Sequence, residues 1–313
     1  MIKNESKKNG LVELFRFLCS LWVAYFHGFS PILSDKFNGE NASTDFFFMV
    51  SVFFFLKSFE KYIERPTGEG VRFIFWGRTK RFIVPLCLAA MSILLCNIIF
   101  EMDMGFNWPL SFLWFFAGQF AYLSLFYLIL KKLKRTTAFN IASIIIACIC
   151  ISLVIFDLKQ FYRVVRGPAM VAIGMLASQL PRININLKDR VNSERITLFI
   201  YALGFSISAI SFIYLAYLPG QATWKLHLMC CVVCPALLYF ATGLPVRSKF
   251  LNLLGEFSVF VYLAQCPILF HHYAVSDDTR DQFPLLCICA VAMFIINRIV
   301  NKIANQKQLV KQA

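Results

Sequence analysis

The chain has 313 residues, of which 59% are hydrophobic and 15% charged, and its mean hydropathy is +0.66. A soluble domain is about half apolar and a quarter charged, so this composition excludes a soluble core with a single anchor and predicts a membrane protein. The net charge of +14 would suggest nucleic acid as the partner of a soluble protein. In a membrane protein it predicts Lys- and Arg-rich cytoplasmic loops, and no nucleic acid.

Apolar windows of about 20 residues recur along the chain and predict an all-α, polytopic membrane protein with about ten transmembrane helices. The predicted spans are 11–29, 44–62, 82–100, 108–130, 138–156, 164–181, 196–218, 224–244, 250–271 and 283–303. The segments between them are short, so we expect a single integral membrane domain over 1–313. The longest cytoplasmic connection is expected at 63–81, a basic segment with a flexible Pro-Thr-Gly-Glu-Gly turn.

The placement of Lys and Arg predicts the orientation of these spans. Of the 31 Lys and Arg residues, 24 fall on one side and six on the other, with Arg16 inside the first span. The positive-inside rule then places both termini in the cytoplasm. The sixth span is short, but leaving it out would reverse the charge bias of every later loop, so it is kept.

The eleven cysteines lie mostly inside apolar runs. They lack the spacing of a zinc site, so we expect small buried side chains and no metal.

The first predicted span contains three ionisable residues, Glu13, Arg16 and His27. Charged groups in a membrane helix are costly and commonly functional. Arg16 and His27 are eleven residues apart, which places them about 16 Å apart on nearly the same helix face. Glu13 lies one turn before Arg16 and is expected to pair with it. The alternative is an Arg reaching the membrane surface and a His at the interface.

Arg16, ten intervening residues and His27 resemble the R-x10-H motif in the first helix of the membrane-bound acyltransferase 3 family, whose members O-acylate bacterial surface polysaccharides. Three further segments resemble motifs of this family in the same order along the chain. They are 44–53 (TDFFFMVSVF), 78–85 (RTKRFIVP) and 255–267 (GEFSVFVYLAQCP).

Three residues depart from the family pattern. Val52 stands where the family usually has Gly, which predicts looser packing of the second helix. Lys80 replaces the second Arg of an R-x-R pair, keeping the charge but losing bidentate geometry. Gln265 replaces a His, which favours hydrogen bonding over proton transfer at this position.

The resemblance implies an acyl-CoA-dependent O-acyltransferase in the bacterial cytoplasmic (inner) membrane. The donor is expected to be acetyl-CoA or another acyl-CoA, with acetyl the expected group. The acceptor is expected to be a sugar hydroxyl of a cell-surface polysaccharide or its lipid-linked precursor. The lipid bilayer and the polysaccharide assembly machinery are the other expected partners.

The family motifs assign the donor and the chemistry to particular residues. Arg78, Lys80 and Arg81 are expected to hold the CoA phosphates, unless they only anchor the cytoplasmic side. Arg16 would bind the pantetheine or pyrophosphate end of the donor, or only neutralise Glu13.

His27 is the expected general base, because an imidazole titrates near neutral pH. Asp45, at the outer end of the second span, is expected to orient it, as in a catalytic triad without Ser. Its alternative is a helix N-terminal acid.

Other polar residues are expected to contact the acceptor. Arg163 and Arg166 fall on the outer side, where they would bind a charged glycan or sit at the interface. Tyr262 and Gln265 are three residues apart and are expected to line the cavity. The remaining histidines, His227, His271 and His272, are expected to be interfacial.

A transporter or flippase is the main alternative function, because it would use the same helices and intramembrane charges. Against it, the chain lacks an inverted repeat of Gly- or Pro-broken helices, and the acyltransferase motifs occur in order. A purely structural partner of a polysaccharide synthase is the third possibility, and it leaves Arg16 and His27 unexplained.

Overall fold

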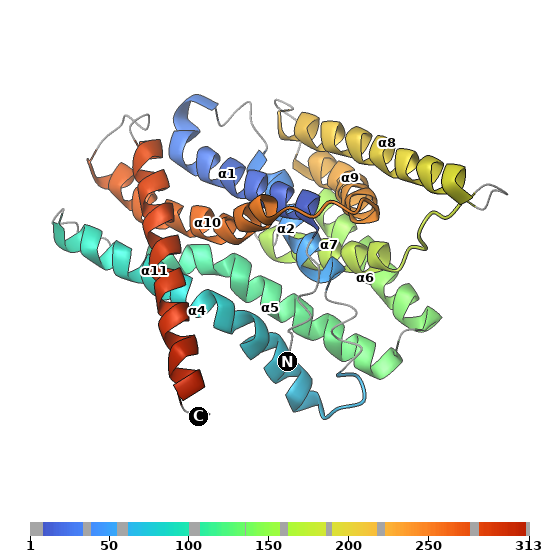
Figure 1. Ribbon diagram of the computed structural model, residues 1–313, viewed down its shortest axis with the longest axis horizontal. Helices are drawn as coiled ribbons and strands as arrows, with labels where there is room; N and C mark the ends of the chain where they lie inside the picture. Colours follow the sequence, from blue (N-terminus) through green and yellow to red (C-terminus); the bar gives the residue numbers. More distant parts are fainter. Residues whose placement is uncertain are drawn as a thin grey trace.

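The computed structural model describes residues 9–33, 39–54, 62–99, 107–134, 136–156, 162–185, 190–217, 223–275 and 282–310. All regular structure in these ranges is helical. The helices are α1 (Gly10–Leu33), α2 (Gly39–Phe53), α4 (Thr67–Ile99), α5 (Asn107–Leu133), α6 (Thr137–Ile155), α7 (Tyr162–Ser178), α8 (Arg190–Ala216), α9 (Thr223–Gly243), α10 (Lys249–Val275) and α11 (Gln282–Val310). Each of the ten predicted spans overlaps one of them. In Figure 1, α11 lies toward one end of the bundle and α6, α8 and α9 lie toward the other.

Several helices have the length and composition of membrane spans. Within the described residues, four stretches are long and apolar enough to cross a bilayer: Thr137–Ile155, Val191–Ala216, Trp224–Gly243 and Leu286–Ile303. α6 and α8 also expose large apolar side chains, which would be costly in water and suit contact with lipid tails. Examples are Ile145, Ile149, Phe199 and Ile210. The fold is therefore that of a multi-pass helical membrane protein.

Asn9 fixes the start of α1 against the end of α9. Its side-chain oxygen accepts hydrogen bonds from the backbone N–H groups of Leu11 and Val12, at 3.0 and 3.3 Å, as an N-cap does. Its amide nitrogen donates to the carbonyl oxygens of Ala241 and Leu244, both at 2.9 Å. One side chain therefore satisfies unpaired backbone groups at the ends of two helices.

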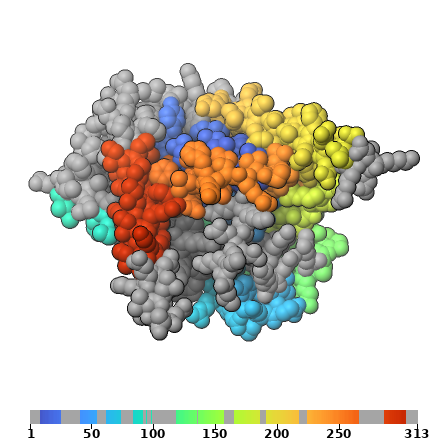
Figure 2. Space-filling view, viewed as in Figure 1, coloured from blue at the N-terminus to red at the C-terminus, as the bar shows by residue number. Residues whose placement is uncertain are grey.

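α1 and α10 form the most extensive helix pair of the bundle, and they run in the same direction. A Cβ built on Gly10 would lie 2.9 Å from Leu251 Cδ1, and one built on Gly255 would meet Glu13. Gly10 and Glu13 of α1 therefore face Leu251 and Gly255 of α10 in the same order along the chain, so the two helices are parallel. Figure 2 shows the surface of α1 beside that of α10 on one face of the molecule.

The flexible turn expected within the connection at 63–81 is helical from Thr67 onward, so the prediction of a turn was wrong. α4 begins at Thr67, directly after Pro66, and runs for 33 residues without a break. The Tyr127 hydroxyl of α5 donates to the Tyr62 carbonyl oxygen at 3.0 Å, and the Tyr127 ring lies against Gly70. Gly70, one of the two glycines in the expected turn, therefore lets α4 pack closely on α5.

The second helix packs more closely than its Val52 predicted. Val52 is fully buried, and the facing residue on α7 is Gly174, where a Cβ would lie 2.9 Å from Val52 Cγ1 and 3.0 Å from the Met49 carbonyl oxygen. The small residue that α2 lacks is thus supplied by the neighbouring helix. α7 has only 17 residues, about 25 Å of helix, and packs against α2, α5, α6 and α9.

We expect Gly174→Ala to destabilise the protein by about 1–3 kcal/mol, because the added methyl group overpacks the contact with α2. Thermal unfolding of the purified protein in detergent measures this loss. Gly68→Ala is the matched control, since nothing lies within 4 Å of a Cβ built there. The double variant Gly174→Ala/Val52→Gly should recover part of the loss. Equal melting temperatures for Gly174→Ala and Gly68→Ala would contradict the close packing.

Candidate functional site

Glu13 and Arg16 form an ion pair on the first turns of α1. Arg16 donates one guanidinium nitrogen to both carboxylate oxygens of Glu13, at 2.9 and 3.2 Å. The Glu13 side chain is 10% exposed and that of Arg16 is 28% exposed. The pair therefore neutralises two charges within an apolar helix and fixes the guanidinium in one direction.

Gly255 provides the space for this pair. A Cβ at position 255 would lie 1.7 Å from Glu13 Oε2 and 2.6 Å from its Cβ, so no other residue fits there without displacing the carboxylate. Ser258, one turn later, bonds back to the Gly255 carbonyl oxygen at 2.7 Å. The segment of α10 that resembles a family motif thus begins at the contact that holds Glu13.

A second group of buried ionisable residues joins α2, α7 and α9. Asp45 is fully buried, His227 is 2% exposed and Arg166 is 3% exposed. His227 Nδ1 is hydrogen-bonded to Asp45 Oδ2, and Arg166 Nε lies 3.8 Å from Asp45 Oδ1. Arg166 also donates to Asn41 Oδ1 at 2.8 Å, one helical turn before Asp45. We call these four residues the outer cluster, after the predicted side of the membrane on which they lie.

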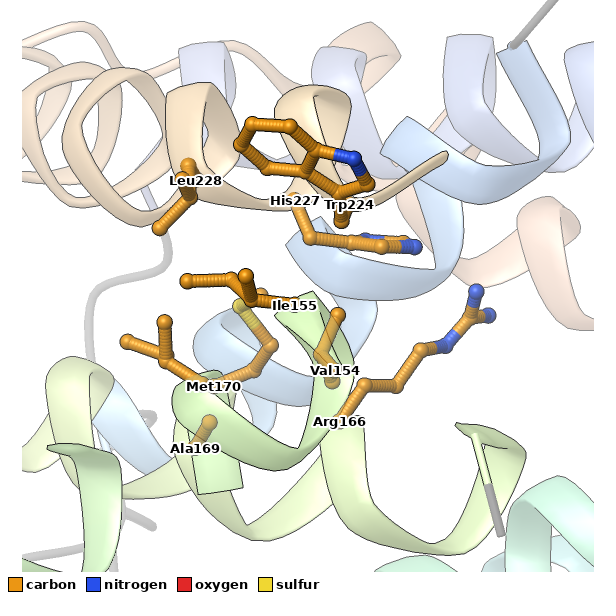
Figure 3. Close-up of a pocket in the computed structure, with 9 residues that line it drawn as sticks. Val154, Ile155, Arg166, Ala169, Met170, Trp224, His227 and Leu228 are labelled. Atoms are coloured by element: carbon orange, nitrogen blue, oxygen red, sulfur yellow. The ribbon is translucent and has the colours of Figure 1, made fainter. Parts of the chain in front are cut away.

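A small pocket between α6, α7 and α9 borders the outer cluster (Figure 3). Arg166, His227 and Trp224 line it together with apolar side chains, and it has room for about one water molecule. In Figure 3, the His227 ring and the Arg166 guanidinium point away from the apolar end at Met170. The pocket is thus too small for a sugar or an acyl chain.

The structure places only some of the expected site residues. The side chains of His27, Arg78, Lys80, Arg81 and Arg163 lie outside the described residues, although their backbones belong to α1, α4 and α7. Arg78, Lys80 and Arg81 share the continuous helix α4. Tyr262 and Gln265 lie on α10, where Tyr262 is partly exposed and Gln265 is buried. Arg166 is buried and interacts with Asp45 and Asn41, which argues against the alternative that it lies at the membrane interface.

The structure brings Asp45 to His227, a residue that the sequence analysis placed at the interface. Phe46, next to Asp45, packs on Phe15 at 6.3 Å between ring centroids. Phe15 is twelve residues before His27, which is about 18 Å along a straight helix. Asp45 is therefore hydrogen-bonded to His227, and its orientation of His27 stays a prediction.

A signal for the burial of His227 was present in the sequence. His227, Cys230 and Cys234 occupy positions i, i+3 and i+7, which share one helix face, and all three are buried. Small apolar thiols on one face indicate that the face is buried, and a His among them then needs a partner. The partner itself could not be found this way, because Asp45 is 182 residues away.

The helices define a multi-pass membrane protein that holds ionisable residues inside its bundle. The chain matches the family model described as an acyltransferase domain over residues 9–302, and it therefore belongs to the acyltransferase 3 family. Membership implies an enzyme that transfers an acyl group from a donor. No curated protein and no solved structure matches the chain.

We expect Asp45→Asn to lower the free energy of unfolding by about 3–5 kcal/mol, because it removes a buried counter-charge that faces Arg166 and His227. Asp45→Leu/Arg166→Met, which removes both charges, should recover most of that loss. Thermal or denaturant unfolding in detergent measures both variants.

Glu256→Gln is the matched control for Asp45→Asn. It breaks the Glu256–Arg298 ion pair, which has the same type of partners at 2.9 Å but is about half exposed. Exposed pairs contribute about 1 kcal/mol or less. If the two single variants lost equal stability, the outer cluster would not be a buried charge network.

Proposed function

We propose that the protein transfers an acyl group, with acetyl expected, from acyl-CoA to a sugar hydroxyl of a cell-surface polysaccharide or its lipid-linked precursor. The observation that carries this proposal is the family match over residues 9–302. The ion pair Glu13–Arg16, held by Gly255, supports it, because two segments that resemble family motifs meet there. The choice of acyl-CoA as donor and of a sugar hydroxyl as acceptor rests on the resemblance of these segments to motifs of the acyltransferase 3 family.

The proposed topology has ten crossings of the bacterial cytoplasmic membrane, with both termini inside. The parallel packing of α1 and α10 supports it. These helices are the first and ninth predicted spans, and two odd-numbered spans of an alternating series must run in the same direction. The excess of Lys and Arg in the predicted cytoplasmic segments gives the same orientation.

In the proposed reaction, the donor enters from the cytoplasm along α4. Arg78, Lys80 and Arg81 hold the CoA phosphates through charge-assisted hydrogen bonds. Arg16, oriented by Glu13 and deeper in the bundle, contacts the pantetheine or pyrophosphate end.

His27, in the outer part of α1, takes the proton of the sugar hydroxyl as its oxygen attacks the thioester. Asp45 acts on the outer side of the membrane, where it interacts with His227 and Arg166 of the outer cluster. Arg163, one turn before the buried Arg166, remains the proposed contact for a charged acceptor. Tyr262 and Gln265 of α10 remain proposed substrate contacts that line the cavity.

His27→Ala and His27→Gln should abolish acylation while the protein still accumulates in the membrane, because a general base contributes a factor of about 10²–10⁴. Arg16→Ala should also lose activity, and Arg16→Lys should keep part of it if the charge is sufficient. Mass spectrometry of the surface glycan from cells with matched protein levels measures the acyl group directly.

His272→Ala, at a predicted outer helix end, is the control for the His27 variants. Normal acylation in His27→Ala cells would exclude His27 as the base. A glycan of unchanged mass in a deletion strain would favour the transporter alternative over the enzyme.

The proposed sidedness predicts opposite labelling of two positions. In a Cys-depleted background, Lys80→Cys should resist a membrane-impermeant thiol reagent in intact cells and react after permeabilisation. Asp35→Cys or Glu40→Cys, in the first predicted outer loop region, should react in intact cells. Labelling of Lys80→Cys from outside would overturn both the topology and the donor site.

The donor site has a separate readout in purified protein. Neutralising Arg78, Lys80 and Arg81 together should weaken acetyl-CoA binding, and more strongly at low salt, where exposed charges are least screened. Unchanged affinity would make these residues membrane anchors and move the donor site to Arg16.

A further inference from the structure

The buried amide of Gln265 has no hydrogen-bond partner within the described ranges of the chain. Its side chain is 1% exposed, and neither Oε1 nor Nε2 makes a hydrogen bond in the described part of the chain. Each such group costs about 1–3 kcal/mol relative to a paired one, and buried polar groups in native proteins are almost always paired. Other described side chains, among them Ser43, Ser143 and Asn252, have a single unbonded atom, whereas both polar atoms of Gln265 are unbonded. Such an amide is available to bind a ligand.

The position of Gln265 follows from the parallel packing of α1 and α10. Leu251, Gly255, Tyr262 and Gln265 fall within an arc of about 80° on α10, the side that meets α1 at Gly10 and Glu13. Gln265 is ten residues after Gly255 and is therefore level with the α1 position ten residues after Glu13. Position 27 lies four residues beyond that level, about 6 Å further along α1.

α10 also packs against α4, the helix that carries Arg78, Lys80 and Arg81. Gln265 therefore lies on the helix that joins the proposed base helix to the proposed donor helix. A group bound at Gln265 would be close to the point where donor and acceptor must meet.

The surroundings of Gln265 select the kind of group that fits. Val261, one turn before it on the same side of α10, is buried and apolar, as is Ala24 at the same level on the side of α1 that faces α10. A sugar would bring several hydroxyl groups, each of which needs a partner when it leaves water. A short acyl chain brings one carbonyl oxygen and an apolar tail, so one amide donor and apolar walls are sufficient.

We propose that Gln265 binds the acyl group of the donor, with Nε2–H donating to the carbonyl oxygen of the thioester. This assignment rests on the proposed function. The sugar oxygen forms a bond to the carbonyl carbon, His27 takes the hydroxyl proton, and the carbonyl oxygen becomes negatively charged. The C–S bond then breaks, the CoA thiolate leaves, and it receives that proton. The amide donor stabilises the oxyanion more than the uncharged carbonyl, which is what accelerates the reaction.

Gln265→Met tests the assignment, because Met has a similar volume and no amide. We expect its melting temperature in detergent to rise, since the unpaired polar atoms are gone. Glycan acylation at matched protein levels should fall about 10²–10³-fold, the usual loss for one oxyanion donor. Gln265→His, which restores an N–H donor and the family's residue, should recover part of the activity.

Binding to purified protein separates this assignment from the proposed function. Wild-type protein should bind acetyl-CoA about fivefold more tightly than CoA, the worth of one neutral hydrogen bond. Gln265→Met should bind both equally, with the affinity for CoA unchanged.

Ser258→Ala is the control, because Ser258 lies on the same side of α10 and its hydroxyl is already bonded within the helix. It should keep the preference for acetyl-CoA. A lower melting temperature for Gln265→Met with normal acylation would overturn the assignment and make Gln265 a structural residue. An unchanged preference for acetyl-CoA in Gln265→Met would also overturn it. If wild-type protein bound neither molecule, the proposed donor would be wrong, and the assignment would fall with it.

Discussion

A charge inside an apolar helix is tolerated only where it is paired and held in place, and the pair Glu13–Arg16 meets both conditions through Gly255. Because position 255 has no side chain, the Glu13 carboxylate occupies the space of the missing Cβ. The contact sets α1 and α10 in one parallel register, and Asn9 separately joins the start of α1 to the end of α9. That register determines how far apart Gln265 of α10 and position 27 of α1 lie along the helix axes.

The buried polar groups of the bundle fall into two kinds. In the outer cluster, each of the three ionisable side chains has an oppositely charged or hydrogen-bonding partner on another helix, so the cluster joins α2, α7 and α9. Such a network costs desolvation but fixes which helices are neighbours. Gln265 is of the other kind, since neither atom of its buried amide is hydrogen-bonded within the described residues. The fold alone explains a paired group, whereas for the amide of Gln265, with both polar atoms unbonded, the proposed cause is a bound ligand.

The sequence predicts best what depends on neighbours along the chain. Apolar windows locate the helices of the described residues, because a membrane span needs about 20 apolar residues. The spacing of Glu13 and Arg16 places them one turn apart. The pairing of Asp45 with His227 and the fit of Gly174 against Val52 depend on which helices become neighbours. Turn rules also fail at Gly70, because they treat glycine as a source of backbone freedom. There it serves instead as the smallest side chain beside Tyr127.

The departures at Val52 and Gln265 differ in what they change. At position 52, α2 carries Val, and Gly174 on α7 provides the space for it, so the two helices still pack closely. At Gln265 the chemistry itself changes, because an imidazole can take or give a proton near neutral pH and an amide cannot.

Because position 265 carries an amide, His27 alone transfers the proton in the proposed reaction. The Gln265 amide polarises the carbonyl group of the thioester, and it remains uncharged at every pH. The two tasks then rest on different helices, α1 and α10, and the contact of Glu13 with Gly255 sets the distance between them. The rate would follow the protonation of one imidazole, while the bound acyl group would keep its orientation at any pH at which the bundle stays folded.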